Sequence, residues 1–208
     1  MTRFEPPGPP APLFREVLRL LAAGDGAAAA LLPRLEAYPA YAPGWLALAE
    51  ALNGRNQTSA ALLAFRRAAQ GEGAAAVLHR AGQGLAALGD AAAAERAFRH
   101  ALTVEAGFAP AWYSLGLVLQ DNGDFAAAAA AFGHAHGLRP DFHEAAFNQG
   151  VALQETGDLE AALSAYAAAH RQRPASLARI AQALVSAPQG ALWLRPSALR
   201  AVLDARAA

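Results

Sequence analysis

The sequence predicts an all-α fold, a right-handed α-α superhelix (solenoid) of about five helix pairs followed by a capping helix and a tail. Three observations predict it. A set of small, aromatic and turn residues recurs every 34 residues. Alanine, the best helix former, supplies much of the 55% hydrophobic fraction. Glycine–aspartate pairs interrupt the helical runs at a fixed place in four of the five units.

The repeat is clearest between residues 109 and 140, where two helical runs flank one turn. Its marker residues are Gly116, Gly123, Asp124, Ala128, Phe132, Ala135 and Pro140. One period later the same places hold Gly150, Gly157, Asp158, Ala162, Tyr166, Ala169 and Pro174, and one period earlier Gly82, Gly89, Asp90, Ala94, Phe98 and Ala101. Recurrence in register predicts that these units fold alike.

The N-terminal part departs from the pattern. Residues 1–10 are rich in proline, which fixes φ and lacks an N–H donor, so we predict a disordered N-terminus. Apolar residues at helical spacing predict a helix over 12–23, and Gly24–Asp25 then ends it and starts a second helix, over about 25–38. Pro33 lies inside that second helix and predicts a kinked or shortened end unit.

The second unit begins near Pro43 and keeps the register with two changes. Asn56 stands where the other units have the turn glycine, and asparagine is the next best residue in the left-handed conformation. The marker Phe65 lies 33 rather than 34 residues before its counterpart, so one residue has been lost. We place the loss in the linker at 71–73.

These observations predict the following organisation. The disordered N-terminus is 1–10, and the repeat array is 11–174, with units at about 11–40, 41–73, 75–108, 109–142 and 143–174. A capping helix at 175–187 covers the last unit, and a tail at 188–208 carries a short helix. Three roles stay open for this tail with its Trp193: it packs back on the capping helix, makes a homodimer contact, or docks in a groove.

Each repeated residue has a mechanical role. The turn glycines tolerate a positive backbone angle, and the aspartate after each one caps the N–H groups that begin the next helix. Small residues lie where the two helices of a unit cross, and we expect an aromatic ring to fill the space between one unit and the next. The small residues are Gly82, Gly116, Gly150, Ala94, Ala128 and Ala162, and the rings are Phe98, Phe132 and Tyr166.

The W-x-x-L-G sequence at Trp112, Leu115 and Gly116, with the markers that follow it, resembles the tetratricopeptide repeat (TPR) family. The resemblance covers roughly residues 13–174. It implies a fold of stacked helix pairs and a role in binding other proteins rather than in catalysis. The bias toward alanine and arginine is typical of a bacterial protein from a GC-rich genome.

In that family the first helices of successive units line a concave groove that holds peptide segments of partner proteins. The resemblance therefore implies a groove lined by Leu46, Glu50, Asn53, His79, Arg80, Gln83, Tyr113, Leu117, Gln120, Phe147, Asn148, Val151 and Gln154. Tyr113 and Phe147 are either anchors for the partner or packing residues between neighbouring first helices. One branch of the family grips a C-terminal carboxylate with lysine, asparagine and arginine. This chain has no lysine and holds Leu46, Glu50 and His79 at the matching places, so we expect no such clamp.

Composition and motifs exclude several other functions. Seventeen basic and seventeen acidic residues cancel, and without a basic block we expect no binding to nucleic acid. No long apolar run predicts membrane insertion, and no secretory signal is visible, so the expected location is cytoplasmic. The chain has no cysteine. His134 and His136 point to different faces of one helix, so we expect neither a metal nor a cofactor. Phosphate loops and nucleophile motifs are absent, so we expect no enzyme.

The leading interpretation is a non-catalytic protein–protein interaction adaptor that binds a peptide or helix of a partner in the concave groove. One alternative is a self-assembling homo-oligomeric scaffold joined through the tail. The other is an accessory module of a separately encoded transferase, which the cap and tail faintly resemble in sequence.

Overall fold

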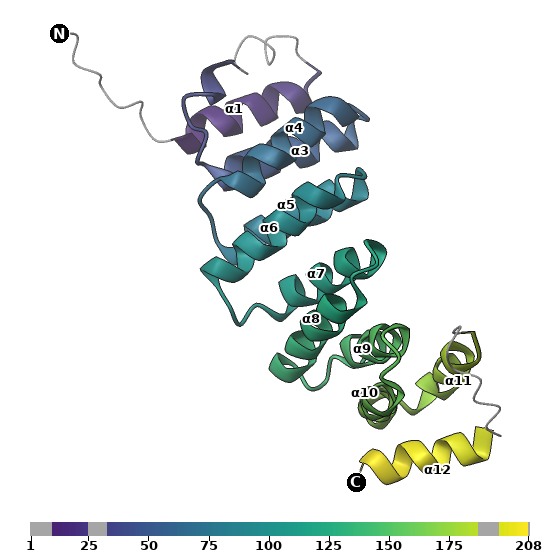
Figure 1. Cartoon of the computed structure of the whole chain (residues 1–208). Coiled ribbons are helices and arrows are strands. Elements are labelled where there is room, and N and C mark those ends of the chain that lie inside the picture. Colours follow the sequence, from purple (N-terminus) through teal and green to yellow (C-terminus); the bar gives the residue numbers. More distant parts are fainter. Residues whose placement is uncertain (1–9, 25–32, 187–195, 208) are drawn as a thin grey trace. The chain divides into compact units, whose positions relative to one another are not determined.

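The computed structural model describes residues 10–24, 33–186 and 196–207, and helices make up most of them (Figure 1). Consecutive helices pack as pairs, which confirms the all-α fold of stacked helix pairs. The chain divides into two compact bodies, Met1–Ala106 and Gly107–Ala208. We call them the N-terminal body and the C-terminal body and describe each by itself.

The N-terminal body contains α1 (Pro10–Ala22), α3 (Ala42–Gly54), α4 (Thr58–Gln70), α5 (Ala75–Ala87) and α6 (Ala91–Val104). Helix α3 pairs with α4, and α5 pairs with α6. The C-terminal body contains the pairs α7 (Ala109–Asp121) with α8 (Phe125–Leu138) and α9 (His143–Glu155) with α10 (Leu159–Gln172). A 3-10 turn η1 (Pro174–Ser176), α11 (Leu177–Ser186) and α12 (Pro196–Ala207) follow.

Predictions made for residues 1–9, most of the second helix of the first unit, and Trp193 lie outside the described residues. Helix α11 occupies most of the segment predicted as the capping helix. None of the described helices is long and apolar enough to cross a membrane.

The turns between paired helices confirm the expected backbone conformation. Gly89, Gly123 and Gly157 have φ values of +84°, +80° and +86°, and Asn56 adopts +59° in the same place. The aspartate after each glycine accepts a hydrogen bond from the backbone N–H three residues later. These bonds join Asp90 to Ala93, Asp124 to Ala127 and Asp158 to Ala161, over 3.0 to 3.1 Å. Each turn therefore ends one helix and caps the next with residues of its own unit.

The repeated rings lie against the small glycines of their own units. A Cβ atom added to Gly116 would lie 2.6 Å from the Phe132 ring, and one added to Gly150 would lie 2.6 Å from the Tyr166 ring. Phe98 lies against Gly82 in the same way. Each ring thus packs between the two helices of its own unit, where glycine leaves room for it. The sequence analysis placed these three rings between units, and the structure adds that each also packs inside its own unit; Tyr166 in addition shares an apolar cluster with Ile180 and Leu184 beyond its unit.

The shortened linker between α4 and α5 pairs with the linker that precedes α3. Tyr41 and Glu72 form an isolated β-bridge, and the Glu72 N–H donates to the Ala40 carbonyl over 2.6 Å. Gly71 is buried against the same carbonyl, which a Cβ atom would approach to 2.8 Å. The place where one residue has been lost is therefore a close approach of two backbones, which requires glycine.

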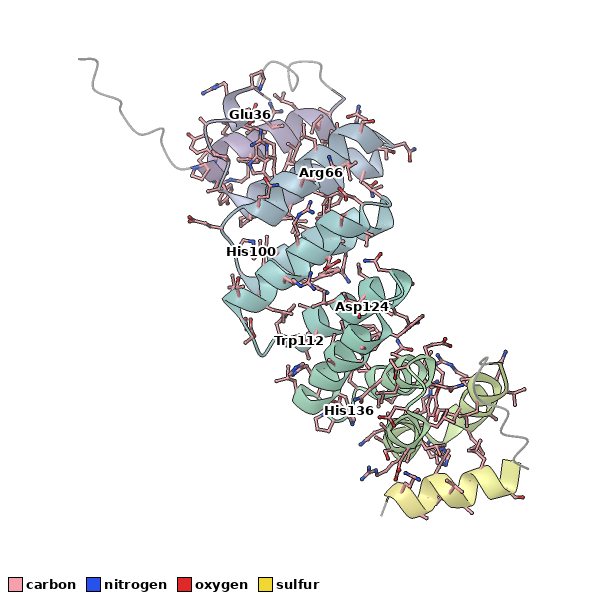
Figure 2. The ribbon with its side chains drawn as sticks, viewed as in Figure 1. Glu36, Arg66, His100, Trp112, Asp124 and His136 are labelled. Atoms are coloured by element: carbon pink, nitrogen blue, oxygen red, sulfur yellow. The ribbon has the colours of Figure 1, made fainter. Side chains whose placement is uncertain are left out.

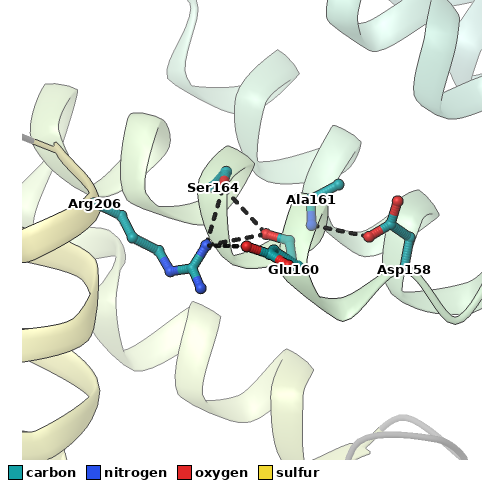
Figure 3. Close-up of polar contacts among 5 residues, drawn as sticks. All are labelled: Asp158, Glu160, Ala161, Ser164 and Arg206. Carbon is teal, nitrogen blue, oxygen red and sulfur yellow. Dashed lines mark hydrogen bonds and ion pairs between the residues drawn. The ribbon is translucent and has the colours of Figure 1, made fainter.

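Helix α12 packs against α10 and α11. Its Leu199 and Leu203 are 2% and 0% exposed and share an apolar cluster with Tyr166, Ile180 and Leu184. Arg206 donates to the Ser164 hydroxyl over 3.3 Å and reaches the Glu160 carbonyl at 3.5 Å (Figure 3). Of the three roles left open for the tail, its described part shows the first, packing back on the end of the array.

A buried hydrogen-bond chain crosses this cluster. The Tyr166 hydroxyl donates to Oε1 of Gln154 over 3.0 Å, and Nε2 of Gln154 donates to the Ala183 carbonyl over 3.1 Å. Burial, with the Glu155 charge, raises the pKa of Tyr166 far above its usual value, so the phenol stays neutral. This chain of hydrogen bonds joins α9, α10 and α11 inside the buried core of the C-terminal body.

We expect Tyr166→Phe to lower the free energy of unfolding by about 1 to 3 kcal/mol, because it leaves a buried amide oxygen without a donor. Urea unfolding followed by circular dichroism measures the change. Tyr113→Phe is the control, since Tyr113 is only half-buried and loses a hydrogen bond that water can replace. Equal losses in the two variants would contradict this account.

Candidate functional site

The predicted groove residues of the N-terminal body lie on α3 and α5. Leu46 and His79 are buried, and the His79 ring lies 5.4 Å from the Phe98 ring. Glu50 and Arg80 are exposed and form an ion pair across the two helices, with 2.6 Å between Oε1 and Nη2. Exposed pairs of this kind contribute little stability. This ion pair shows that the structure brings Glu50 and Arg80 together, as two of the predicted groove residues. Asn53 and Gln83 stay exposed on the same two helices.

The groove residues of the C-terminal body lie on α7 and α9. Nδ2 of Asn148 donates to the Tyr113 hydroxyl over 3.1 Å, which joins the two helices side chain to side chain. The Tyr113 ring lies 4.7 Å from the Phe142 ring. Burial raises the pKa of Tyr113, and the Glu144 charge adds to this effect. Tyr113 is half-buried, so one part of it packs and another part is accessible.

Phe147 and Gln154 contribute mainly to packing. Phe147 is 9% exposed, with the Arg179 guanidinium 4.3 Å above its ring centre. Gln154 is 2% exposed, and both of its polar atoms are used in the hydrogen-bond chain described above. The reason is α11, which packs beside α9. A partner would therefore reach little of either side chain.

In the C-terminal body, four predicted residues besides Tyr113 keep accessible surface. Leu117 on α7 is 38% exposed, and Gln120, Asn148 and Val151 are partly exposed. We group Leu117, Asn148 and Val151 with Tyr113 and the exposed Arg179, because these residues lie on two successive first helices and the capping helix and because Asn148 bonds to Tyr113. We call this group the α7–α9–α11 face and define it by Tyr113, Leu117, Asn148, Val151 and Arg179.

A small cavity of about 110 Å³ lies beside this face. Its walls are His143, Phe147, Arg173, Ala175, Ser176 and Arg179. The sequence analysis missed Arg173, Ser176 and Arg179 as site residues because they lie at the end of the repeat or beyond it. A signal was present, because Arg173 directly precedes Pro174 and Arg179 lies on the polar side of the capping helix.

A second cavity lies in the N-terminal body, between α4 and α6, where Figure 2 labels Arg66 and His100. Its volume is about 290 Å³, and Arg96 and Gln70 also line it. Arg66 is already paired with Asp90 over 2.7 Å, and Nδ1 of His100 is 2.9 Å from the Ala69 carbonyl oxygen. Two of its polar groups are therefore engaged within the chain.

The histidines of α8 point apart, as their spacing predicts. The His134 ring stacks on Trp112 with centres 4.4 Å apart, whereas His136 is half-buried, and burial lowers its pKa (Figure 2). Within the described residues, no group of three or more His, Asp or Glu side chains is placed to hold a metal ion.

Comparison with known families now adds to this geometry. The tetratricopeptide repeat family pattern matches residues 79–132 and again 113–176. The chain is a tetratricopeptide repeat protein. Members of this family are generally protein-interaction modules without catalytic activity, and the matches include α7 and α9. No curated protein matches the sequence of this TPR protein.

Solved structures support the same fold. One crystal structure of MamA is 20% identical, with a TM-score of 0.61, and the match covers 82% of this TPR protein and 95% of MamA. YrrB, described as a TPR protein with an unusual peptide-binding site, is 19% identical, with a TM-score of 0.60. That match covers 78% of this chain and 86% of YrrB. At such identities the likeness establishes the fold and nothing further.

Proposed function

We propose that this TPR protein is a non-catalytic adaptor that binds a peptide or helix of a partner protein through the α7–α9–α11 face. The observation that carries the proposal is the contact of Tyr113 with Asn148 across two successive first helices, beside the exposed Leu117. The solved structure of YrrB supports it by analogy, because YrrB is described as a TPR protein with an unusual peptide-binding site.

The chemistry of the face suits a peptide. Leu117 and Val151 offer apolar surface, and the Asn148 amide oxygen offers an acceptor for a peptide backbone. Gln120 lies on α7 near the face and is partly exposed. Oε1 of Gln120 is buried and has no hydrogen-bond partner among the described residues. A face with two aliphatic side chains, one tyrosine, one amide and one arginine supports binding in the micromolar range, about 8 kcal/mol.

The expected location, cofactor use, partner class, repeat boundaries and groove residues form part of the same proposal. The chain acts in the cytoplasm, uses no cofactor, and takes another protein as its partner. The repeat boundaries and the groove residues predicted from the sequence also stay part of it. Neither the homo-oligomeric scaffold nor the transferase accessory module has an observation of its own among the described residues.

A pair of exposed leucines tests the proposal. Leu117→Glu puts a charge on the α7–α9–α11 face, and Leu138→Glu puts the same charge on α8, where Leu138 is 45% exposed. Wild type and both variants serve as bait in cell extract, and bound proteins are read by mass spectrometry. We expect a partner held by wild type and by Leu138→Glu but reduced at least about tenfold with Leu117→Glu.

Circular dichroism of the three baits checks that each is folded. A partner retained by all three, or lost equally from both variants, would contradict the placement of the binding face. Enrichment of nothing but further copies of this chain would favour the scaffold.

A further inference from the structure

The small cavity beside the α7–α9–α11 face is enriched in positive charge. Arg173 and Arg179 are two of its six lining residues, and no carboxylate is among the six. Neither guanidinium pairs with a carboxylate within the described part of the chain. An arginine side chain stays protonated at every physiological pH. The cavity therefore holds two uncompensated positive charges.

His143 also lines the cavity, and its imidazole lies between the positive charge of Arg173 and the negative charge of Glu144. Its Nε2 atom lies 3.1 Å from Nη1 of Arg173 and 3.0 Å from Oε1 of Glu144. Glu144 does not line the cavity, so its carboxylate competes for the imidazole without filling the space between the arginines. An anion in the cavity would still meet both guanidinium groups.

Ser176 provides the second, independent observation. It lines the cavity, is only 6% exposed, and its Oγ atom is buried without a hydrogen-bond partner among the described residues. Buried hydroxyls in folded proteins nearly always have a partner. A hydroxyl donor beside two guanidinium groups suits an acceptor with a negative charge.

The size of the cavity restricts the ligand further. A cavity needs roughly 10 to 15 Å³ to hold a single water molecule. The cavity of about 110 Å³ therefore admits an anionic group of a few heavy atoms but no nucleotide ring system. Carboxylates fit arginine forks in a bidentate manner and accept a hydroxyl hydrogen bond at the same time.

We propose that this cavity binds a carboxylate of the partner peptide, held by Arg173, Arg179 and the Ser176 hydroxyl. The proposal rests on the adaptor function in naming a peptide as the source of the carboxylate. It differs from the carboxylate clamp of the TPR family, whose matching places lie in the N-terminal body and hold Leu46, Glu50 and His79. The residues named here lie at the end of the array and on its capping segment.

The test uses small carboxylates and needs no partner. The probes are N-acetylglutamic acid α-amide, which carries only a side-chain carboxylate, and N-acetylalanine, which carries only a C-terminal one. Sodium chloride at equal ionic strength is the blank, and inorganic phosphate is the competing anion. The readout is the arginine Nε–H signals of the full chain in nitrogen-15 spectra, assigned through Arg173→Gln and Arg179→Gln.

We expect one of the two carboxylates to shift the Arg173 and Arg179 signals saturably. Arg179→Gln should weaken that binding at least about tenfold, Ser176→Ala should weaken it several-fold, and Arg171→Gln should leave it unchanged. Arg171 is the control because it is exposed, near in sequence and outside the cavity wall.

Three outcomes would overturn the proposal: no shift beyond the chloride blank, an equal shift in Arg179→Gln, or saturation by phosphate alone. The probe that binds identifies whether a side chain or a chain end supplies the carboxylate. Because the leucine variants test the adaptor function separately, carboxylate binding without a Leu117-dependent partner would reject the adaptor and keep the cavity site. The opposite pair of results would keep the adaptor and reject the site.

Discussion

Replacing Leu203 with alanine is expected to lower the free energy that holds α12 on the C-terminal body by about 2 to 5 kcal/mol. The Leu203 side chain is fully buried in the cluster with Tyr166, Ile180 and Leu184. Truncation loses the transfer energy of the removed methyl groups and leaves a void among residues that relax only partly. We expect the effect to be largest in α10 and α12, where hydrogen exchange of backbone amides measures local opening.

Leu138→Ala is the matched control for this prediction. Leu138 is 45% exposed on α8, so we expect a change within about 0.5 kcal/mol. Equal protection of α10 in wild type and Leu203→Ala would mean that α12 contributes nothing to the end of the array. A concentration-dependent mass that disappears with Leu203→Ala would instead show that this leucine joins two copies.

Gly116→Ala is expected to be the other severe change, with a loss of about 1 to 3 kcal/mol or more in the free energy of unfolding. The new Cβ would lie 2.6 to 3.0 Å from three atoms of the Phe132 ring. That ring is completely buried, so it cannot turn into solvent to make room. Relief then requires α7 and α8 to move apart. Urea unfolding followed by circular dichroism measures the loss.

The control lies on the same helix pair. Gly137 is a helical glycine of α8, and a Cβ atom added there would meet nothing within 4 Å. Alanine has the higher helix propensity, so we expect Gly137→Ala to be neutral or to stabilise by up to about 1 kcal/mol. A loss from Gly137→Ala as large as that from Gly116→Ala would refute the steric explanation.

Much of the fold follows from residues that act locally. Gly123 adopts its positive φ and Asp124 caps the next helix because both roles depend only on neighbours in the chain. Asn56 occupies the same conformation although the letter differs, since the requirement is for a left-handed residue rather than for glycine itself. Local rules of this kind can be applied to a sequence without knowing its tertiary contacts.

Features that depend on distant contacts could not be predicted in the same way. The 34-residue spacing shows that an aromatic ring recurs at the position of Phe132. It does not show whether the ring packs against a helix of its own unit or against the next unit. The bridge from Tyr41 to Glu72 joins two linkers, and neither linker carries a strand pattern. The packing of α12 depends on Leu199 and Leu203, whose helical spacing is equally compatible with a contact between two copies.

The candidate site shows the same limit. Helical spacing places Gln154 in the groove stripe with Val151, but α11 packs beside α9 and buries the amide in the core. Tyr113 and Asn148 are 35 residues apart, close to one period, which is why the repeat predicts that they lie near each other. Arg179 has no counterpart of the same type one period earlier, so the repeat carries no information about it.

The turn geometry has a consequence for how such chains change in length. Gly89–Asp90, Gly123–Asp124 and Gly157–Asp158 each end one helix and begin the next with bonds made inside a single unit. A gene duplication that copies one period would therefore also copy the turn glycine and the capping aspartate. A deletion of one period would leave no helix without its cap. The array is modular in the genetic sense, because each of these repeats carries the residues that end one helix and cap the next.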